Sequence, residues 1–230
     1  MTTVREHPVN SAILADAAAG LFARWGRSTT VDEHGGAAVL EPSVVRELHG
    51  LAGLPTDGTV GNAGLVHVYG YLLSNAETPY GPKHARWTSG AVARALGVEA
   101  AALLPDPPRD RTGRTPLAAL TPLLERLLAA PPRAAAVVDE FGDGIRARTV
   151  LLDGPGGALL AYGVATRRCA GGASGAGEPD RVLPVTVFPI DDVSTVLCSV
   201  EAEPPRLRYN AVDASGRAGT ALRERDVRRL

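Results

Sequence analysis

Lysine is almost missing from this chain of 230 residues, in which Lys83 is the only lysine among 24 lysines and arginines. A lysine on a solvated surface would be free to change to arginine, as every other basic position has done. The one that remains therefore indicates a role that arginine cannot fill. A buried lysine amine can lose its proton and attack a carbonyl, whereas a guanidinium stays charged.

Aromatic residues and cysteines are also few, and the net charge is close to zero. Aromatic residues make up 4% of the chain, so the core must consist mainly of Ala, Val and Leu. The net charge of −1 argues against a dedicated nucleic-acid-binding protein, which usually carries a strong basic excess. Only Cys169 and Cys198 are present and no signal peptide is recognisable, so we expect reduced thiols and a cytoplasmic protein.

Long apolar runs are missing as well. The longest apolar stretch near the N-terminus is interrupted by Asp16 and Arg24, so it cannot span a bilayer, and we expect no membrane association. Arginine in place of lysine, together with abundant Ala, Gly and Pro, indicates a GC-rich bacterial genome, and a role in specialised biosynthesis fits such a source.

The hydrophobic content of 45% is enough for a sizeable core. Apolar spacing predicts helices over 9–25, 42–52, 90–103 and 117–129. It predicts strands over 134–140, 146–153, 158–166, 182–189, 194–201 and 206–212, with Gly154-Pro-Gly-Gly157 as a hairpin turn. Helices followed by strands indicate an α+β fold, with N-terminal helices packed on a C-terminal, mainly antiparallel sheet.

We expect one domain over 1–230, with a helical part over about 1–130 and a strand-rich part over about 131–215. Loops are expected over about 104–116 and 170–181, and the charged run 223–229 is expected to be a solvated helix or tail. Residues 64–73 fit a strand or a helix, and in both cases His67 and Tyr71 share a face. Whether the N-terminal helices form a separate module, and whether the chain forms a homodimer, stays open.

The candidate site lies in the stretch 67–87, which holds three of the five tyrosines, one of the two tryptophans and the single lysine. Ionisable side chains of this kind can exchange protons with a substrate, while aromatic and arginine side chains can bind it. The predicted catalytic residues are Lys83, His67, Glu77 and His84. The predicted substrate-binding residues are Tyr69, Tyr71, Tyr80, Arg86 and Trp87.

The sharpest interpretation makes Lys83 a Schiff-base nucleophile on a stiff loop that Pro79 and Pro82 hold. Its pKa would be lowered by burial or by a neighbouring cation, and Arg86 would bind a carboxylate. The stretch Tyr80-Gly-Pro-Lys83 resembles the aromatic-glycine-proline-lysine stretch of acetoacetate decarboxylase-like enzymes. Those families usually have a second lysine where this chain has His84, so we assign the chain to no family. The interpretation predicts an enzyme of lyase, decarboxylase or cyclase type, acting on a small anionic, carbonyl-bearing metabolite.

Two other interpretations stay open. In the first, His67, Glu77 and His84 perform acid–base chemistry on a phosphate or carboxylate substrate, while Lys83 and Arg86 only bind it. In the second, the protein is a non-catalytic ligand- or protein-binding domain with an exposed aromatic patch, formed by Tyr69, Tyr71, Tyr80 and Trp87. No spacing typical of a zinc or calcium site is present, so we expect no metal and no other cofactor.

The stretch Arg206-Leu-Arg208-Tyr-Asn210 alternates like a strand and places both arginines on one face. A solvated face is the favoured interpretation, and two guanidinium groups directed into a pocket are the alternative.

Overall fold

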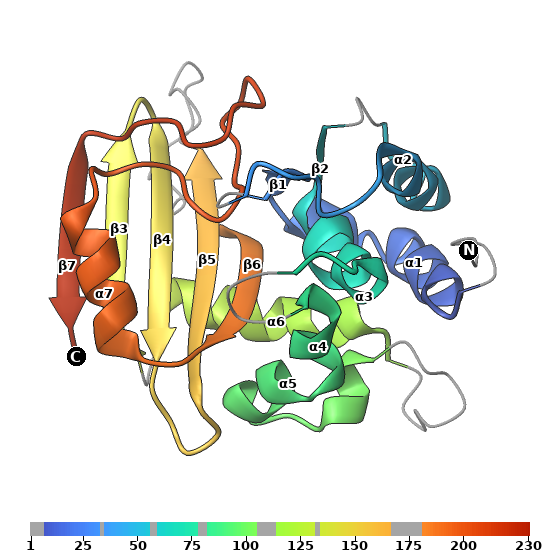
Figure 1. Cartoon of the computed structure of the whole chain (residues 1–230), viewed down its shortest axis with the longest axis horizontal. Coiled ribbons are helices and arrows are strands. Elements are labelled where there is room, and N and C mark those ends of the chain that lie inside the picture. The colour runs from blue at the N-terminus through green and yellow to red at the C-terminus, as the bar shows by residue number, and fades with distance from the viewer. Residues whose placement is uncertain are drawn as a thin grey trace, which may run out of the picture.

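Helices fill one half of the molecule and a five-stranded sheet fills the other (Figure 1). The structure is a computed structural model that describes residues 7–32, 35–55, 59–77, 82–104, 114–131, 134–166 and 181–230. The arrangement confirms the predicted α+β fold with N-terminal helices beside a C-terminal antiparallel sheet. Tyr80, Cys169 and most of both predicted loops lie outside the described residues.

The first predicted helix is shorter than expected. Helix α1 (Val9–Ala18) ends before Gly20, whose φ of +67° is left-handed, and a short 3-10 helix η2 (Leu21–Arg24) follows. Glycine adopts this conformation without the steric cost that other residues incur, so it separates the two helices. Helix α2 (Pro42–Leu51) matches its prediction.

Residues 64–73 are helical, which decides the question that the sequence left open. Strand β2 (Val60–Asn62) pairs with β1 (Arg27–Thr29), and the π-helix η3 (Leu65–Gly70) and α3 (Tyr71–Leu73) follow. The shared face of His67 and Tyr71 is confirmed, because their ring centroids lie 4.8 Å apart in an edge-on contact. Short π-helical segments occur frequently at functional sites.

The next segment contains one more helix than predicted. Helix α4 (Lys83–Thr88) begins directly after Pro82, and α5 (Ala91–Leu96) and the 3-10 helix η4 (Ala100–Leu103) occupy the predicted helix 90–103. Gly97, with φ of +70°, ends α5 and divides that prediction in two. Helix α6 (Pro116–Ala129) agrees with the prediction of 117–129 and begins at Thr115, whose hydroxyl accepts a hydrogen bond from the Ala118 amide.

The sheet is antiparallel throughout, in the order β6-β5-β4-β3-β7. Four strands lie where alternation predicts them, namely β3 (Ala134–Gly142), β4 (Ile145–Leu152), β5 (Ala158–Thr166) and β6 (Leu183–Ile190). The predicted hairpin turn joins β4 to β5, with the Gly157 amide donating to the Gly154 carbonyl. Helix α6 crosses one face of the sheet and α7 lies on the other (Figure 1).

Three predictions near the C-terminus are wrong. Residues 194–201 belong to helix α7 (Val193–Ala202), which begins at Asp192, where the carboxylate accepts a hydrogen bond from the Thr195 amide. Residues 206–212 form only isolated bridges, because the left-handed φ of Tyr209 and Asn210 interrupts an extended backbone. The charged run contains the edge strand β7 (Glu224–Arg229), not a helix or free tail.

Two buried carboxylates on β3 explain why so charged a segment pairs with the sheet. Asp139, on one face, accepts hydrogen bonds from Arg148 at 2.8 Å and from Arg228 of β7 at 2.7 Å. Glu140, on the other face, accepts one from Arg225 of β7 at 2.7 Å. The arginines of β7 therefore neutralise acids that would be costly to bury alone.

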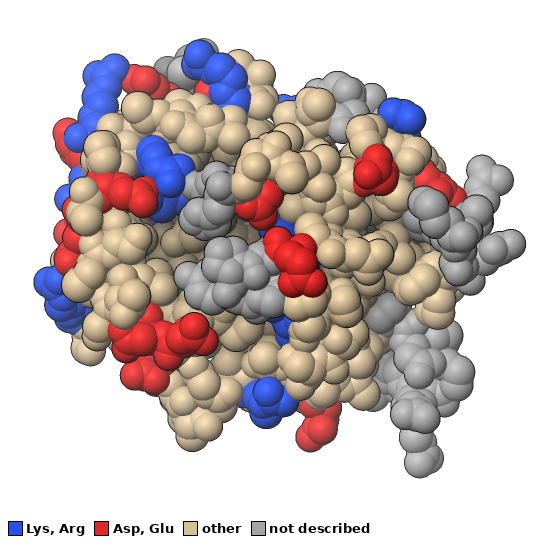
Figure 2. Space-filling model, in the orientation of Figure 1, with Lys and Arg blue, Asp and Glu red and all other residues tan. Residues whose placement is uncertain are grey.

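Charges of both signs are interspersed over the face of the molecule in Figure 2, in keeping with the near-neutral net charge. Within the described part of the chain, no helix combines the length and the apolar character that crossing a membrane requires.

Candidate functional site

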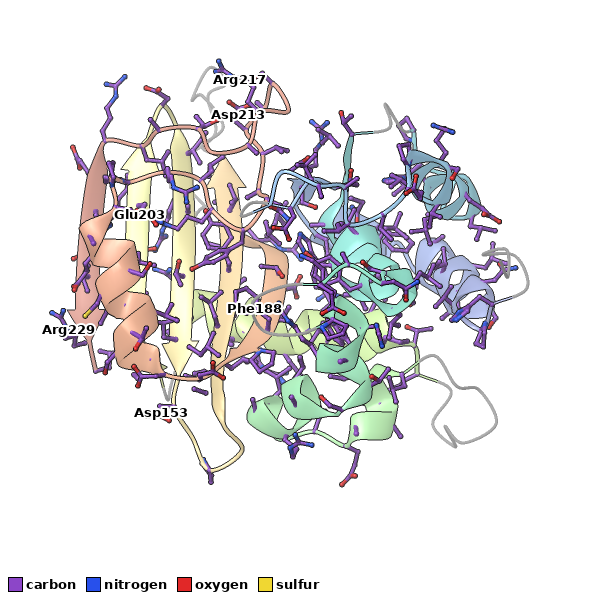
Figure 3. All side chains as sticks on the ribbon, viewed as in Figure 1. Asp153, Phe188, Glu203, Asp213, Arg217 and Arg229 are labelled. Atoms are coloured by element: carbon purple, nitrogen blue, oxygen red, sulfur yellow. The ribbon has the colours of Figure 1, made fainter. Side chains whose placement is uncertain are left out.

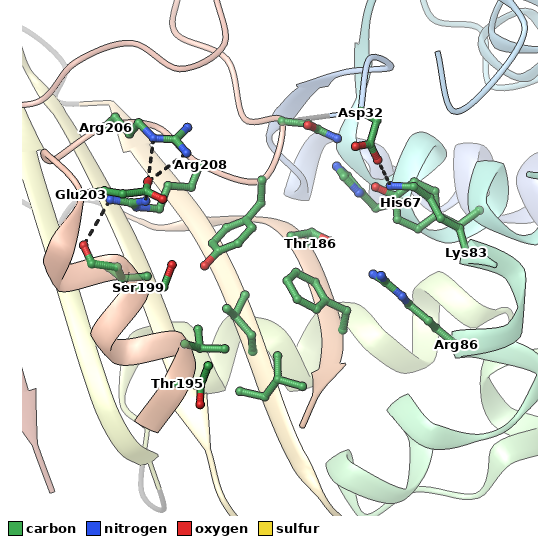
Figure 4. Close-up of a pocket in the computed structure, with 18 residues that line it drawn as sticks. Asp32, His67, Lys83, Arg86, Thr186, Thr195, Ser199, Glu203, Arg206 and Arg208 are labelled. Carbon is green, nitrogen blue, oxygen red and sulfur yellow. Dashed lines mark hydrogen bonds and ion pairs between the residues drawn. The ribbon is translucent and has the colours of Figure 1, made fainter. Parts of the chain in front are cut away.

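A cavity of about 250 Å³ lies where the helical half meets the sheet (Figure 4). Strands β5 and β6 contribute its floor, α7 and the segment after it line one side, and α3, η3 and α4 line the other. It is lined by Asp32, His67, Tyr71, Lys83, Arg86, Leu160, Thr186, Phe188, Ile190, Thr195, Val196, Ser199, Val200, Glu203, Arg206, Arg208, Tyr209 and Asn210.

Lys83 is buried in the wall of this cavity, with 5% of its surface exposed. The extended backbone of Pro82 places it in the first turn of α4, so the predicted loop position of Lys83 is wrong. Its Nζ lies 3.2 Å from Oδ2 of Asp32 and 4.6 Å from the ring centroid of Tyr71. Burial is the main cause that lowers the pKa of Lys83; Arg86 adds to the effect and the Asp32 carboxylate opposes it.

His67 is buried beside Lys83, and among the described residues neither of its ring nitrogens has a hydrogen-bond partner. Burial, followed by the charge of Lys83, lowers the pKa of His67 to about 3, so the imidazole is neutral at pH 7. A buried polar group without a partner costs free energy. A ligand in the cavity would recover that cost by bonding to the ring.

Arg86 lies one turn after Lys83 on α4, so both side chains reach the same cavity. Figure 4 shows its guanidinium directed toward the centre of the site. The guanidinium carbon lies 5.4 Å from the ring centroid of Phe188 on β6, a distance at which a cation and a ring attract. Figure 3 shows Phe188 at the border between the sheet and the helices. Arg86 therefore supplies a positive charge beside an aromatic surface.

The arginines on the opposite side serve mainly as structural cations. Arg208 is 4% exposed and pairs with Glu140 at 3.2 Å and with Glu203 at 2.5 Å, and Arg206 pairs with Glu203 at 3.1 Å. The favoured expectation of a solvated face is therefore wrong for Arg208. On this side the carboxylates of Glu140 and Glu203 balance Arg206 and Arg208, whereas the side of Lys83 and Arg86 has one lining carboxylate, Asp32, for two cations.

Tyr209 and Asn210 connect the two halves of the site. Both are left-handed, with φ of +54° and +65°, a conformation that costs non-glycine residues about 1–3 kcal/mol each. The Asn210 side chain hydrogen-bonds to Tyr71, and the Tyr209 ring packs edge-on against Phe188 at 5.5 Å between centroids. Burial raises the pKa of Tyr71 far above its ordinary value, so its hydroxyl stays protonated.

Four of the nine predicted site residues line the cavity: His67, Tyr71, Lys83 and Arg86. The structure places the others that it describes elsewhere. Tyr69 is buried and donates to the Asp16 carboxylate, Trp87 is buried in the core, His84 lies with Nδ1 3.3 Å from the Ser74 carbonyl oxygen, and Glu77 is exposed. Tyr80 lies outside the described residues.

Asp32 is not predictable as the partner of Lys83, because the two residues lie far apart in the chain. Thr186 and Phe188 have the pattern of ordinary alternating strand residues, so spacing does not indicate them either. Tyr209 and Asn210 belong to the alternating stretch 206–210 that the sequence analysis singles out. The alternation does not show which face of that stretch is buried.

Among the described residues, no three His, Cys, Asp or Glu side chains gather as a metal site would require. Cys198 is a free, exposed thiol on α7. No protein-family model, curated protein or solved structure matches this chain.

Proposed function

We propose that this cavity is the active site of a lyase-type enzyme, in which Lys83 forms an imine with the carbonyl of a small anionic metabolite. The observation that carries the proposal is the burial of the only lysine in a cavity wall, with a lowered pKa and with Arg86 on the same face. A nucleophilic lysine needs an unprotonated amine, which burial favours.

The chemistry follows from the neighbours of the amine. Asp32 takes a proton from the Lys83 ammonium, and the free amine attacks the carbonyl carbon. A C–N bond forms as the carbonyl electron pair moves to oxygen, and a proton passes from the newly bonded nitrogen to that oxygen, which gives a neutral carbinolamine. The resulting hydroxyl receives a proton from Asp32, leaves as water, and an iminium ion remains.

The iminium ion withdraws electrons from the adjacent carbon. A bond from that carbon to a carboxylate, to another carbon or to hydrogen can then break, with its electron pair moving toward nitrogen as an enamine forms. Reprotonation of the enamine and hydrolysis of the imine release the product and restore Lys83.

Arg86 binds the carboxylate of the substrate through charge-assisted hydrogen bonds. Because His67 is neutral at pH 7, its ring positions the substrate by donating or accepting one hydrogen bond. These roles use only side chains that line the cavity, so Glu77 and His84 are not part of the proposal.

A second candidate is non-covalent binding, in which a protonated Lys83 and Arg86 hold a carboxylate or phosphate. The ion pair between Lys83 and Asp32 favours this alternative, because a nearby carboxylate stabilises the ammonium form. An exposed aromatic patch is less well supported. Tyr69, Tyr71 and Trp87 are all buried.

Borohydride trapping tests the proposal. The protein is incubated with 2-oxo or 3-oxo acids, reduced, digested and mapped by mass spectrometry. We expect a reduced adduct on Lys83, which peptide mapping separates from adducts on the N-terminal amine. The Lys83→Arg variant keeps the charge but cannot form an imine, and it should lose the adduct while still binding simple carboxylates.

Absence of an adduct on Lys83 across the acid series, with carboxylate binding intact, would reject the imine and leave the non-covalent alternative.

A further inference from the structure

The cavity has a cationic side and an apolar floor. Lys83, Arg86 and His67 lie on the helical side, and Figure 4 places Thr195 and Ser199 of α7 across the cavity from them. Between these two sides the lining is apolar. It consists of Leu160, Phe188, Ile190, Val196 and Val200.

We infer that the substrate is an oxo acid whose remaining chain is apolar, an extended alkyl or phenylalkyl chain and not a short or polyhydroxylated one. The inference rests on the proposed function for the position of the carbonyl. The tail subsite itself depends only on the lining of the cavity.

Strand register builds the apolar floor. Leu160 on β5 is directly paired with Phe188 on β6, and Ile190 lies two residues further along the same face of β6. Leu160 and Ile190 are buried, so their side chains form a fixed surface. A sugar or a dicarboxylate would have to leave its polar groups without partners against this surface.

The charged groups on the side opposite Lys83 and Arg86 are already neutralised by each other. Glu203 accepts hydrogen bonds from Arg206 at 3.1 Å and from Arg208 at 2.5 Å, and Glu140 also holds Arg208. A second carboxylate on the substrate would therefore find its counter-charges occupied on this side. The side with Lys83 and Arg86 suits the anionic group better, because its lining holds two cations and one carboxylate, Asp32.

The size of the cavity limits the chain. A volume of about 250 Å³ lies just below the usual range of roughly 300–1,000 Å³ for ligand pockets. The cavity therefore suits a metabolite with one chain of moderate length. Binding should strengthen with each added methylene by about twofold to fourfold and then level off once the floor is covered.

The test uses saturated carboxylates, because they cannot form an imine. Affinities for acetate, butyrate, hexanoate, octanoate and phenylpropionate are measured by titration calorimetry. We expect affinity to rise from acetate to hexanoate and to level off at octanoate. Equal affinity for acetate and hexanoate would overturn the inference.

A variant locates the tail subsite. Val196→Asn places an amide in the apolar lining, and Ser194→Asn places the same amide on an exposed position of the same helix outside the cavity. The first should abolish the chain-length dependence and the second should keep it. Should Val196→Asn fail to fold, the series with the unaltered protein decides the question alone.

The two proposals fail separately. Chain-length dependence without a borohydride adduct rejects the imine and supports the apolar subsite. An adduct with equal trapping of pyruvate, 2-oxohexanoate and phenylpyruvate, and flat carboxylate affinities, supports the imine and rejects the apolar subsite.

Discussion

The Nζ atom of Lys83 lies 3.2 Å from the carboxylate of Asp32, and this contact joins the segment after β1 to the first turn of α4. The carboxylate raises the pKa of Lys83, whereas burial, the larger influence, lowers it. Asp32 thus opposes the effect of burial, and its removal should change the reactivity of the amine in a predictable direction.

We expect Asp32→Asn to lower the pKa of Lys83 further. The rate of Lys83 acylation by an amine-selective reagent, followed against pH by peptide mapping, should rise at lower pH than in the unaltered protein. Asp153→Asn, at an exposed position between β4 and β5, is the matched control and should leave the profile unchanged. A shift to higher pH in Asp32→Asn would contradict the assigned electrostatics.

Acid should destabilise the protein through His67. Its pKa is about 3 in the folded state and near 6.5 in the unfolded state, so between these values the unfolded chain binds more protons. The contribution of the neutral His67 to the free energy of unfolding is therefore fully present above about pH 6.5. It decreases as the pH falls toward 3, by at most about 1.4 kcal/mol per pH unit.

The measurement is the free energy of unfolding in urea over this pH range. His67→Gln should flatten the dependence, because glutamine does not titrate. His84→Gln, which replaces a histidine outside the cavity lining, should retain it. Equal slopes in the two variants would show that His67 does not titrate as described.

Arg86 should carry much of the affinity for a carboxylate. Its replacement in Arg86→Gln removes a hydrogen bond to a charged group, which contributes about 1.5–3 kcal/mol, so carboxylate binding should weaken by roughly 10- to 100-fold. Arg94→Gln on α5 removes an arginine that bonds to the Ser89 carbonyl outside the cavity, and it should bind normally. Calorimetric titration with hexanoate distinguishes the two outcomes.

Glu140 should be important for stability. It is 1% exposed and is held by Arg208 and Arg225, so Glu140→Gln removes the carboxylate that pairs with Arg225 and leaves Arg208 with Glu203 alone. We expect a loss of about 3–5 kcal/mol in the free energy of unfolding. Glu224→Gln, at an exposed position of β7, should change stability little, and similar losses in both variants would refute a special role for Glu140.

The helices and central strands could be predicted because their apolar spacing agrees with local propensity. Segment 194–201 is predicted as a strand because Val and Thr favour strands, but it is part of helix α7. Its apolar residues Val193, Val196, Leu197 and Val200 also recur at helical spacing, and the Asp192 cap favours the helix. For β7, the charge pattern indicates a solvated segment, and only the buried acids of β3 explain the pairing.

The site could be predicted where local sequence brings its residues together. Lys83 and Arg86 are one helical turn apart, and His67 and Tyr71 share a face on a strand or a helix. Asp32 and the residues of β6 and α7 reach the cavity through tertiary packing, which spacing along the chain does not encode. The prediction of Trp87 as a binding residue is wrong. Lys83 and Arg86 nearby in the sequence line the cavity, but the Trp87 side chain is buried in the core.

Because the walls of the cavity come from segments between residues 32 and 210, a molecule that occupies it binds the folded state and not the unfolded one. Occupancy should therefore appear as a thermal stabilisation of the whole chain, about 2.7 kcal/mol at a ligand concentration 100 times the dissociation constant. The melting temperature thus offers a way to find the natural ligand among unrelated metabolites. A fragment that lacks either half should show no such response to any of them.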